Sequence, residues 1–578
     1  MEAIVDAYNS HLARASYAAG APPWRSAPDH PLSPLSLRAL PTLILVLLAG
    51  VLVLPVLSVA GSWAQWNTES AQILREMAAT VLPEYLWVTL QLSLMVGVGV
   101  MAMGVPAALL VTVFDFPGRR SFEWLLLLPL AMPAYVTAYA YTDFLQFSGP
   151  LQGWLRASFG LQGRLLPEVR SVWGAAWVFS FSLYPYVYLL ARTALIERAP
   201  QLMEAARLLG APLGRRLREV ALPMARPAVA AGTALALMEV LADYGVSVYF
   251  GIQTFTAGIY KAWLSMDNRI AAAQLATVLL ALVVLLLWLE QHAQRRLRFA
   301  GAATARASSS EARPIALRGG RSLLAWVLCL LPVLMGFVLP VAFMLRPLAA
   351  DWSVLPWQRF LGWAWNSVRL GGMTALLALG AAWFLAYSLR RQPTLLRRGA
   401  VQLISLGYAV PGAVIVVGLL LPVGWLQARW PESGAGALVT VTVGGLLWAY
   451  LVRFVSVALQ SVQSGYARVP RSLDESARML GASGVDVALH VHWPLLRRAG
   501  LAAALLVFVD VMKELPATIV LRPFNTDTLA VVANQLARDE RLGEAALPSL
   551  ALVLVGLVPV ILLSRTLRAE RRPAEAAV

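Results

Sequence analysis

Four acidic residues lie inside long apolar segments, where an ionisable side chain needs a physical reason. Glu239 and Asp243 are four residues apart in one segment, and Asp510 and Glu514 are four apart in another, each 271 positions after its counterpart. Residues with this spacing share one face of a helix. Because a charged side chain at the bilayer centre costs about 2.5 to 3.5 kcal/mol, the four carboxylates predict a hydrated pathway or specific neutralising partners.

Carboxylates in such a pathway are suited to cationic cargo, because hard, highly charged cations prefer oxygen ligands. Anionic cargo such as sulfate or phosphonate fits this lining poorly. The alternative is that Lys513 and nearby tyrosines neutralise some of the acids while the rest face water at the outer side. The residues that we expect to line a translocation pathway, with its acids as transient metal contacts, are Glu239, Asp243, Tyr244, Asp510 and Glu514.

The composition places the whole chain in a bilayer. Of 578 residues, 59% are hydrophobic and only 13% are charged, which is too apolar for a soluble protein of this length. Apolar runs of about 20 residues can cross the membrane only as helices. The expected fold is therefore an all-α integral membrane protein of about twelve spans, near 40–60, 86–114, 121–145, 171–191, 227–251, 270–290, 322–345, 366–389, 399–423, 435–456, 499–521 and 545–564.

The positive charges give an orientation. Lys and Arg concentrate in the segments that lie on the cytoplasmic side if both termini are cytoplasmic, and this topology leaves only Arg369 and Lys513 inside spans. The net charge of +16 is thereby explained without nucleic acid. The single cysteine, Cys329, excludes a disulfide framework or a zinc knuckle. We expect a multi-pass protein of a bacterial inner membrane.

A small, polar and basic segment divides the chain into two halves and has the composition of a linker. The predicted organisation is a disordered cytoplasmic tail (1–38), a first half of six spans (39–293), a cytoplasmic linker (294–321), a second half of six spans (322–568) and a C-terminal cytoplasmic tail (569–578).

One cytoplasmic loop in each half carries one copy of a repeated element. The loop at 196–226 contains EAARLLGAPLGRRLREVALP from Glu204, and the loop at 465–498 contains ESARMLGASGVDVALHVHWP from Glu475, again 271 positions later and without a gap. Each copy is expected to form a helix, a break and a second helix.

Local signals set the expected ends of these helices. Pro200 predicts the first helix start, Gly210 and Gly481 predict left-handed C-terminal caps, and Pro223 predicts the end of the second helix. In the second copy, Ser472 and Glu475 have the spacing of a capping box.

These loops resemble the EAA signature of binding-protein-dependent ABC importer permeases. Matching positions are Glu204, Ala205, Ala206, Gly210, Leu222, Pro223, Glu475, Ala477, Gly481 and Pro494, whereas Ser476, Val491 and Trp493 depart from the signature. The resemblance implies a type I importer permease fold of two homologous six-helix halves. It also implies that each loop couples the permease to one of two ATPase subunits, and that a periplasmic substrate-binding protein delivers the cargo.

The chain itself lacks the motif for ATP hydrolysis. A phosphate-binding loop ends in Gly-Lys-Ser/Thr, but the two lysines, Lys261 and Lys513, follow Tyr260 and Met512. We therefore expect a transport subunit that is not an enzyme and binds no cofactor, with ATP and Mg²⁺ held by the partner subunits.

The wider sequence is similar to the fused ferric-iron permease family. The similarity lies in SFEWLLLLPLAMPAYVTAYAYTDFLQFSGPLQ, FSLYPYVYLLARTAL and ALMEVLADYGVSVYFGIQTFTAGIYKAW. It implies ferric iron as cargo, while permeases for thiamine, polyamines and phosphonate share the loops and stay open as alternatives. A proton-coupled secondary transporter of twelve helices is an alternative of another class, suggested by Asp115-Phe-Pro-Gly118-Arg119-Arg120.

Overall fold

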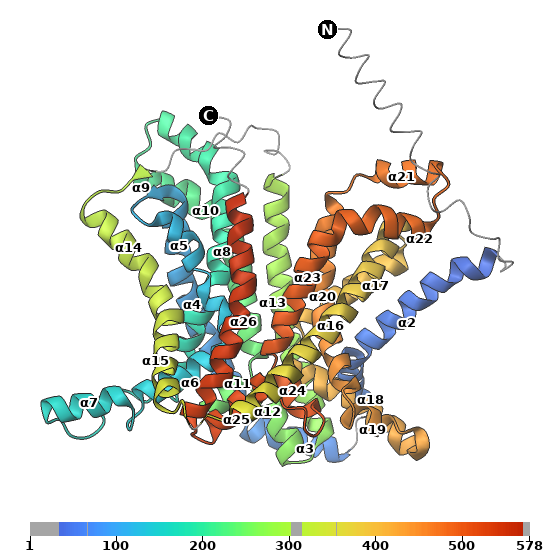
Figure 1. The fold of residues 1–578 in the computed structure, drawn as a ribbon, viewed down its shortest axis with the longest axis horizontal. Coiled ribbons are helices and arrows are strands. Elements are labelled where there is room, and N and C mark those ends of the chain that lie inside the picture. Colours follow the sequence, from blue (N-terminus) through green and yellow to red (C-terminus); the bar gives the residue numbers. More distant parts are fainter. Residues whose placement is uncertain (1–33, 66–67, 302–314, 354, 570–578) are drawn as a thin grey trace, which may run out of the picture.

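The computed structural model describes residues 34–65, 68–301, 315–353 and 355–569. Most of the predicted N-terminal tail, the middle of the predicted linker and nearly all of the C-terminal tail lie outside these ranges. Within them the protein is almost entirely helical, and 3₁₀ or π segments are labelled η (Figure 1).

The elements up to the linker are α2 (Pro34–Gly61), η2 (Ser62–Gln65), α3 (Thr68–Thr80), α4 (Leu82–Val113), β1 (Phe114–Asp115), α5 (Arg119–Leu125), η3 (Leu128–Ala131), α6 (Ala134–Leu145), α7 (Pro150–Phe159), α8 (Val172–Leu208), α9 (Leu213–Arg216), η4 (Leu217–Ala221), α10 (Leu222–Ala242), α11 (Gly245–Tyr249), α12 (Phe255–Tyr260), η5 (Lys261–Ser265) and α13 (Arg269–Gly301).

The elements after it are β2 (Ile315–Ala316), α14 (Gly320–Val333), η6 (Leu334–Val338), α15 (Leu339–Ala350), α16 (Trp357–Arg391), α17 (Leu395–Ser405), η7 (Gly407–Ala409), α18 (Gly412–Arg429), η8 (Pro431–Ser433), α19 (Ala435–Thr440), α20 (Gly444–Ala467), α21 (Arg471–Met479), α22 (Gly484–Asp486), η9 (Val487–His492), α23 (Trp493–Lys513), α24 (Pro516–Leu521), α25 (Leu529–Arg538) and α26 (Leu542–Ala569).

Ten helices in the described part of the chain are long and apolar enough to cross a membrane. An eleventh span results if 119–131 and 134–159, which are bent by 87° at Pro133, are counted together. The predicted span 499–521 corresponds to α23, which is not among them. Its 21 residues include two arginines, an aspartate and a lysine, and these charges lower its apolarity.

The repeat that the sequence predicts is present in the backbone. Helices α10 and α23 begin and end 271 positions apart, α8 and α21 end 271 positions apart, and α11 and α24 begin 271 positions apart. Although it is less apolar, α23 therefore occupies the same place in its half as α10 does in the other.

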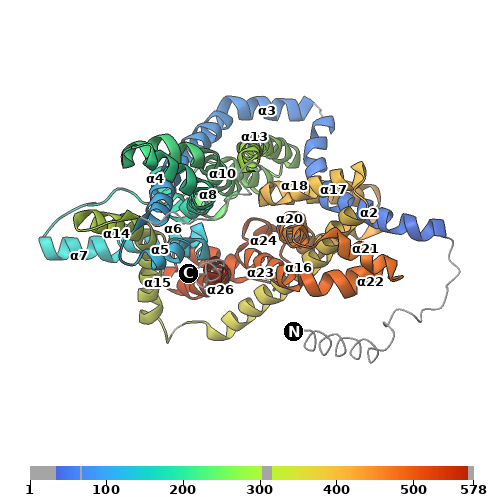
Figure 2. The same ribbon diagram turned by 90° about the horizontal axis from the view of Figure 1, so that it is seen from above.

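The first long helix of each half packs against the other half. Helix α2 lies along α17 and α18, where the Trp448 indole donates to the Val51 carbonyl at 2.9 Å (Figure 2). The approach is so close that a side chain on Gly418 would collide with the Pro55 carbonyl. In return, α14 packs on α4 and α5, with Trp326 edge-on to Phe122. The two halves are therefore interlocked.

A short strand pair returns the chain to the first half before α14 begins. Phe114 and Asp115 of β1 pair in parallel with Ile315 and Ala316 of β2, and the Leu317 amide donates to the Asp115 carbonyl at 2.8 Å. These are the only strands in the described residues. Their pairing holds the end of the predicted linker against the loop after α4.

The two ends of the molecule differ in how the halves meet. Figure 1 shows α9 of the first half and α21 and α22 of the second at one end, on opposite sides. At the other end, α11 and α12 lie close to α24 and α25. The halves thus diverge toward the end that carries the repeated loops and come together at the opposite end.

Candidate functional site

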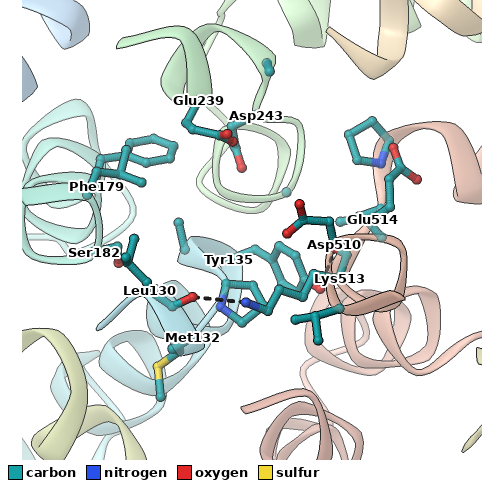
Figure 3. Close-up of a pocket in the computed structure, with 18 of the residues that line it drawn as sticks. Leu130, Met132, Tyr135, Phe179, Ser182, Glu239, Asp243, Asp510, Lys513 and Glu514 are labelled. Carbon is teal, nitrogen blue, oxygen red and sulfur yellow. Dashed lines mark hydrogen bonds between the residues drawn. The ribbon is translucent and has the colours of Figure 1, made fainter. Parts of the chain in front are cut away.

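A cavity of about 400 Å³ lies between the halves and is lined by both. All five residues predicted for the translocation pathway lie in its wall, namely Glu239, Asp243, Tyr244, Asp510 and Glu514. They come from α10 and α23 and from the breaks that follow these helices (Figure 3). The matched helices therefore bring the four acids to one place.

Two of these acids cap broken helices. The Asp243 carboxylate accepts hydrogen bonds from the amides of Val246 and Ser247 at 2.9 and 3.1 Å, at the start of α11. In the same way, the Glu514 carboxylate accepts from the amides of Ala517 and Thr518 at 2.9 and 3.0 Å, at the start of α24. Such caps satisfy amides that have no partner within the helix. This gives part of the acid set a structural role.

The other two acids are less constrained. Glu239 accepts a hydrogen bond from the Tyr408 hydroxyl of the second half at 2.8 Å, and Asp510 accepts none from the residues that the structure describes. Figure 3 shows Glu239 and Asp510 on opposite sides of the same space. Of the four carboxylates, these two are the ones available to a passing ligand.

Two basic side chains share the cavity. Lys513 donates to the Leu130 carbonyl at 3.0 Å, in the break of the bent third span (Figure 3). Arg453 lies 3.7 Å from the Glu514 carboxylate, and its buried Nε has no partner among the described residues. Four acids and two bases thus line the cavity, so it keeps an acidic excess.

Arg453 is a residue that the sequence reasoning missed. It lies within the predicted span 435–456, so the statement that only Arg369 and Lys513 fall inside spans is wrong. A basic residue in an apolar run was the signal that could have identified it. Tyr408 carried no comparable signal, because buried tyrosines are ordinary in membrane helices.

The acids do not form a ready metal site in this conformation. Among the described residues, no three His, Cys, Asp or Glu side chains are placed so that they could hold one metal ion. Any cation in this cavity would meet carboxylates singly or across the gap between the halves. Contact between the pathway acids and the cargo therefore stays a prediction.

The repeated loops end their first helices in the same conformation. Gly210 and Gly481 have φ angles of +80° and +83°, and the amides of Ala211 and Ala482 each bond the carbonyl five residues back at 3.0 Å. This is the Schellman arrangement, in which the left-handed position favours glycine. The two predicted caps are confirmed by the backbone.

Two of the predicted boundaries in the first loop are wrong. Helix α8 runs from Val172 to Leu208 without a break, so Pro200 starts no helix. Pro223 ends none either, because it lies in the first turn of α10 just after the π-helical turn η4. A proline in the first turn leaves no hydrogen bond unmade that the helix would otherwise form.

The predicted capping box is also displaced. Helix α21 begins at Arg471 after Pro470, so Ser472 lies inside the helix and cannot cap it. The box forms instead at α22, where the Ser483 hydroxyl accepts from the Asp486 amide and the Asp486 carboxylate accepts from the Ser483 amide. The chain reversal at Gly481 places Ser483 at a helix start.

Large apolar side chains protrude from the tips of both loops. Leu208 and Leu209 are 81% and 88% exposed, and their counterparts Met479 and Leu480 are 89% and 74% exposed. Apolar groups gathered at such tips typically mark a contact with a partner. The signature residues Glu204 and Glu475 lie within the same turns and are at least partly exposed.

The second loop is held by a buried polar network. The Arg390 guanidinium makes two bonds to Asp474, at 2.8 and 3.0 Å, and His492 lies 2.8 Å from the same carboxylate. Burial would raise the pKa of Asp474, but the hydrogen bonds from Arg390 and His492 outweigh it and lower that pKa. The matching positions in the first loop are Met203 and Ala221, which are buried apolar residues.

Interlocked helical halves, a shared intramembrane cavity and twin exposed loops define a membrane permease that works with a separate motor. Residues 101–299 match the family described as "Binding-protein-dependent transport system inner membrane component". A probable molybdenum ABC transporter permease of Haloferax volcanii is 30% identical over 244 residues, which cover 41% of this chain and 85% of that protein. The chain belongs to this family of ABC importer permeases.

Other relatives extend the similarity. The Fe(3+)-transport system permease protein FbpB 2 of Haemophilus influenzae is 24% identical over 492 residues, covering 84% of this chain and 90% of that protein. The sulfate transport system permease protein CysW of Escherichia coli is 29% identical over 235 residues, covering 39% of this chain and 77% of that protein. The first similarity spans both halves, whereas the second covers less than half of the chain.

Membership settles several expectations from the sequence. The protein is an inner-membrane, multi-pass transport subunit, it is not an enzyme, and permeases of this family bind no cofactor themselves. As a component of a binding-protein-dependent system, it works with an ATPase and a binding protein. The alternative of a proton-coupled secondary transporter is excluded.

Proposed function

We propose that this permease imports ferric iron delivered by a periplasmic binding protein. The observation that carries the proposal is the cavity between the halves, where two available carboxylates, Glu239 and Asp510, face each other from matched helices. Oxygen ligands of this kind suit a hard trivalent cation. Similarity to a ferric-iron permease over 84% of the chain supports the same cargo.

Among the residues that the structure describes, the acids stand singly and not as a metal cluster, and this arrangement suits passage of an ion. A site with a full set of ligands would bind the ion strongly and slow its release, whereas opposed single carboxylates give contacts that are easily exchanged. The Tyr244 phenol also lies in the cavity wall, with its ring centroid 4.4 Å from that of Tyr260, and a phenol oxygen is a further hard donor for ferric iron. In this proposal the acids assist passage and do not store the ion.

Reconstitution tests the cargo. The permease and its ATPase would be placed in liposomes and titrated with candidate periplasmic binding proteins, each loaded with one ligand, while ATP hydrolysis and ⁵⁵Fe uptake are measured. We expect stimulation and uptake with a ferric-iron-loaded protein. Stimulation only by a protein loaded with another ligand would refute iron as the cargo.

An oxyanion is the second candidate, and one structural observation favours it. Arg453 and Lys513 line the same cavity, and guanidinium and ammonium groups are common partners of sulfate-like anions. Relatives named for sulfate and molybdenum transport match 39% and 41% of the chain. The acidic excess of the cavity argues against it, and uptake of ³⁵S-sulfate or molybdate in the same liposomes decides between the two.

The loops around Gly210 and Gly481 are proposed as the docking sites for two ATPase subunits. Their exposed tips, Leu208 with Leu209 and Met479 with Leu480, lie at the same end of the molecule. This end would face the cytoplasm, and both termini would lie on that side. In this proposal the two halves comprise residues 39–293 and 322–568. Closure of the ATPase dimer would then bring the divergent loops together and open the opposite end.

A further inference from the structure

One outer loop carries a large apolar side chain that the protein itself does not cover. Phe524, in the loop 522–528 between α24 and α25, is 95% exposed, more than any other large hydrophobic side chain in the described residues. A phenylalanine left in water loses the hydrophobic stabilisation that burial of its ring would give. A single exposed apolar residue is ordinary, so its surroundings have to decide its meaning.

The loop around Phe524 is rigidly braced. Arg522 donates to the Asp527 carboxylate at 2.7 Å, and the Thr526 hydroxyl donates to the Pro523 carbonyl at 2.7 Å. Asn366 of α16 donates to the Asp527 carbonyl at 3.1 Å. These bonds fix the backbone that carries the exposed phenyl ring, which reduces the entropy that the loop loses when a partner binds.

The corresponding loop of the first half has no such feature. There the chain passes from α11 to α12 through residues 250–254, FGIQT, in which Phe250 and Ile252 are buried. Both loops end at a threonine whose side chain caps the next helix, Thr254 in the first half and Thr528 in the second. The second loop is longer, with the sequence RPFNTDT. The symmetry of the halves is broken where Phe524 protrudes.

The position of this loop favours a protein partner over lipid. Helices α24 and α25 lie at the end opposite the coupling loops, and from above α24 lies toward the middle of the molecule among α16, α20 and α23 (Figures 1 and 2). An apolar anchor with polar groups such as the Arg522–Asp527 pair beside it has the composition of a protein interface.

We propose that Phe524 is an anchor residue for the substrate-binding protein, whose surface would receive the ring in an apolar pocket. This inference rests on the proposed orientation, in which the end with α24 and α25 faces the periplasm. Helix α24 joins the loop to Glu514 in the cavity wall. A partner bound at Phe524 would thus contact the loop that continues, through α24, into the wall of the pathway.

The test uses the reconstituted complex of permease and ATPase, titrated with the loaded binding protein that stimulates wild-type ATP hydrolysis. We expect Phe524→Ala to raise the concentration for half-maximal stimulation about tenfold, as for an interface hot spot. The matched control is Phe159→Ala, a 64% exposed phenylalanine at the end of α7, which should not shift it.

The outcomes separate this inference from the proposed function. An unchanged titration for Phe524→Ala, in a variant that still assembles with the ATPase, overturns the anchor. If no loaded periplasmic protein stimulates the wild type, the proposed function fails instead.

A second measurement distinguishes protein from lipid. Because Cys329 is the only cysteine and is buried, Phe524→Cys in a Cys329→Ser background can carry one environment-sensitive fluorophore. We expect its emission to respond to the loaded binding protein and to be quenched little by nitroxide-labelled lipids. Strong lipid quenching without a response to the protein would overturn the inference in favour of a membrane contact.

Discussion

At the scale of single residues, four carboxylates that look equivalent in the sequence divide into two kinds. Asp243 and Glu514 accept backbone amides at the starts of α11 and α24, whereas Glu239 and Asp510 face the cavity. The division follows the repeat, because each half contributes one acid of each kind. Substitutions at the two kinds should therefore have different consequences.

The cavity-facing acids should matter for transport. Glu239→Gln and Asp510→Asn keep the shape of the side chain but remove its charge, so we expect each to lower iron uptake about tenfold or more, with little change in thermal stability. Uptake of ⁵⁵Fe in proteoliposomes, beside a melting curve, measures both. Normal uptake by both variants would make these acids structural.

The capping acids should matter for stability. Replacing each carboxylate with an amide removes the negative charge that strengthens its bonds to the backbone amides, so Asp243→Asn and Glu514→Gln should weaken the caps and lower the free energy of unfolding by about 1 kcal/mol. Thermal unfolding in detergent provides the measurement, and Glu239→Gln serves as the matched control in the same cavity. If the caps contribute nothing to stability, Asp243→Asn, Glu514→Gln and Glu239→Gln will have the same melting temperature.

At the scale of elements, the two repeated loops have the same backbone conformation but different interiors. Both have a glycine in the left-handed region followed by a π-helical turn before the next span. The first loop packs Met203 and Ala221 in its interior, and the second packs Asp474 and His492 at the matching positions. The outer face is thus similar in both loops, while the inner support is not.

The exposed tips should carry the affinity for the ATPase. One variant replaces both Leu208 and Leu209 with aspartate, and a second replaces both Met479 and Leu480 with aspartate. Each variant loses the apolar contact and gains charge, so we expect its affinity for the ATPase to fall at least tenfold. Titration of purified ATPase against the permease measures it. Glu204→Gln and Glu475→Gln test the signature acids in the same assay. Unchanged assembly and transport in all these variants would refute docking at the loops.

The network in the second loop should respond to pH in a defined direction. Because the pKa of Asp474 is lowered in the folded protein, its contribution to stability is present above the ordinary aspartate range, near 3.9, and is lost as the pH falls through the lowered value. Asp474→Asn should therefore lower the melting temperature at pH 7, and the difference from the wild type should shrink below about pH 4. Asp539→Asn, at an exposed aspartate after α25, is the control. A difference that is constant with pH would contradict this assignment.

At the scale of the whole molecule, the halves are interlocked. Helix α2 packs on α17 and α18, and α14 packs on α4 and α5. The predicted halves 39–293 and 322–568 are therefore sequence units whose first helices are exchanged in space. This exchange allows the coupling loops to diverge at one end without loss of contact between the halves.

Interlocking predicts that the covalent linker is dispensable for assembly. Two chains divided within 302–314 and expressed together should co-purify, because each half holds the first helix of the other. Affinity purification through a tag on one chain measures this. Removing residues 34–61, which make up α2, from the first chain provides the control and should weaken co-purification. Chains that separate even with both helices present would contradict the prediction.

Much of the architecture could be read from the chain alone. The length of the apolar runs gives helices that cross a bilayer, and the constant offset of 271 positions gives the matched pairs α10 with α23 and α11 with α24. It also places the four acids on equivalent helices. Glycine at 210 and 481 indicates where the coupling helices end, since the left-handed conformation favours it locally.

Tertiary packing decided the rest. An apolar pattern shows that a helix avoids water, but it is the same whether the helix faces lipid, its own half or the other half. The sequence therefore could not show that α2 and α14 each pack against the opposite half. The roles of the acids depend on the helix breaks at 243–244 and 514–515, which place two carboxylates beside the free amides at the next helix starts. The Arg453 guanidinium meets Glu514, and the Lys513 ammonium donates to the Leu130 carbonyl of the first half; both partners come from distant segments, and only folding brings them together.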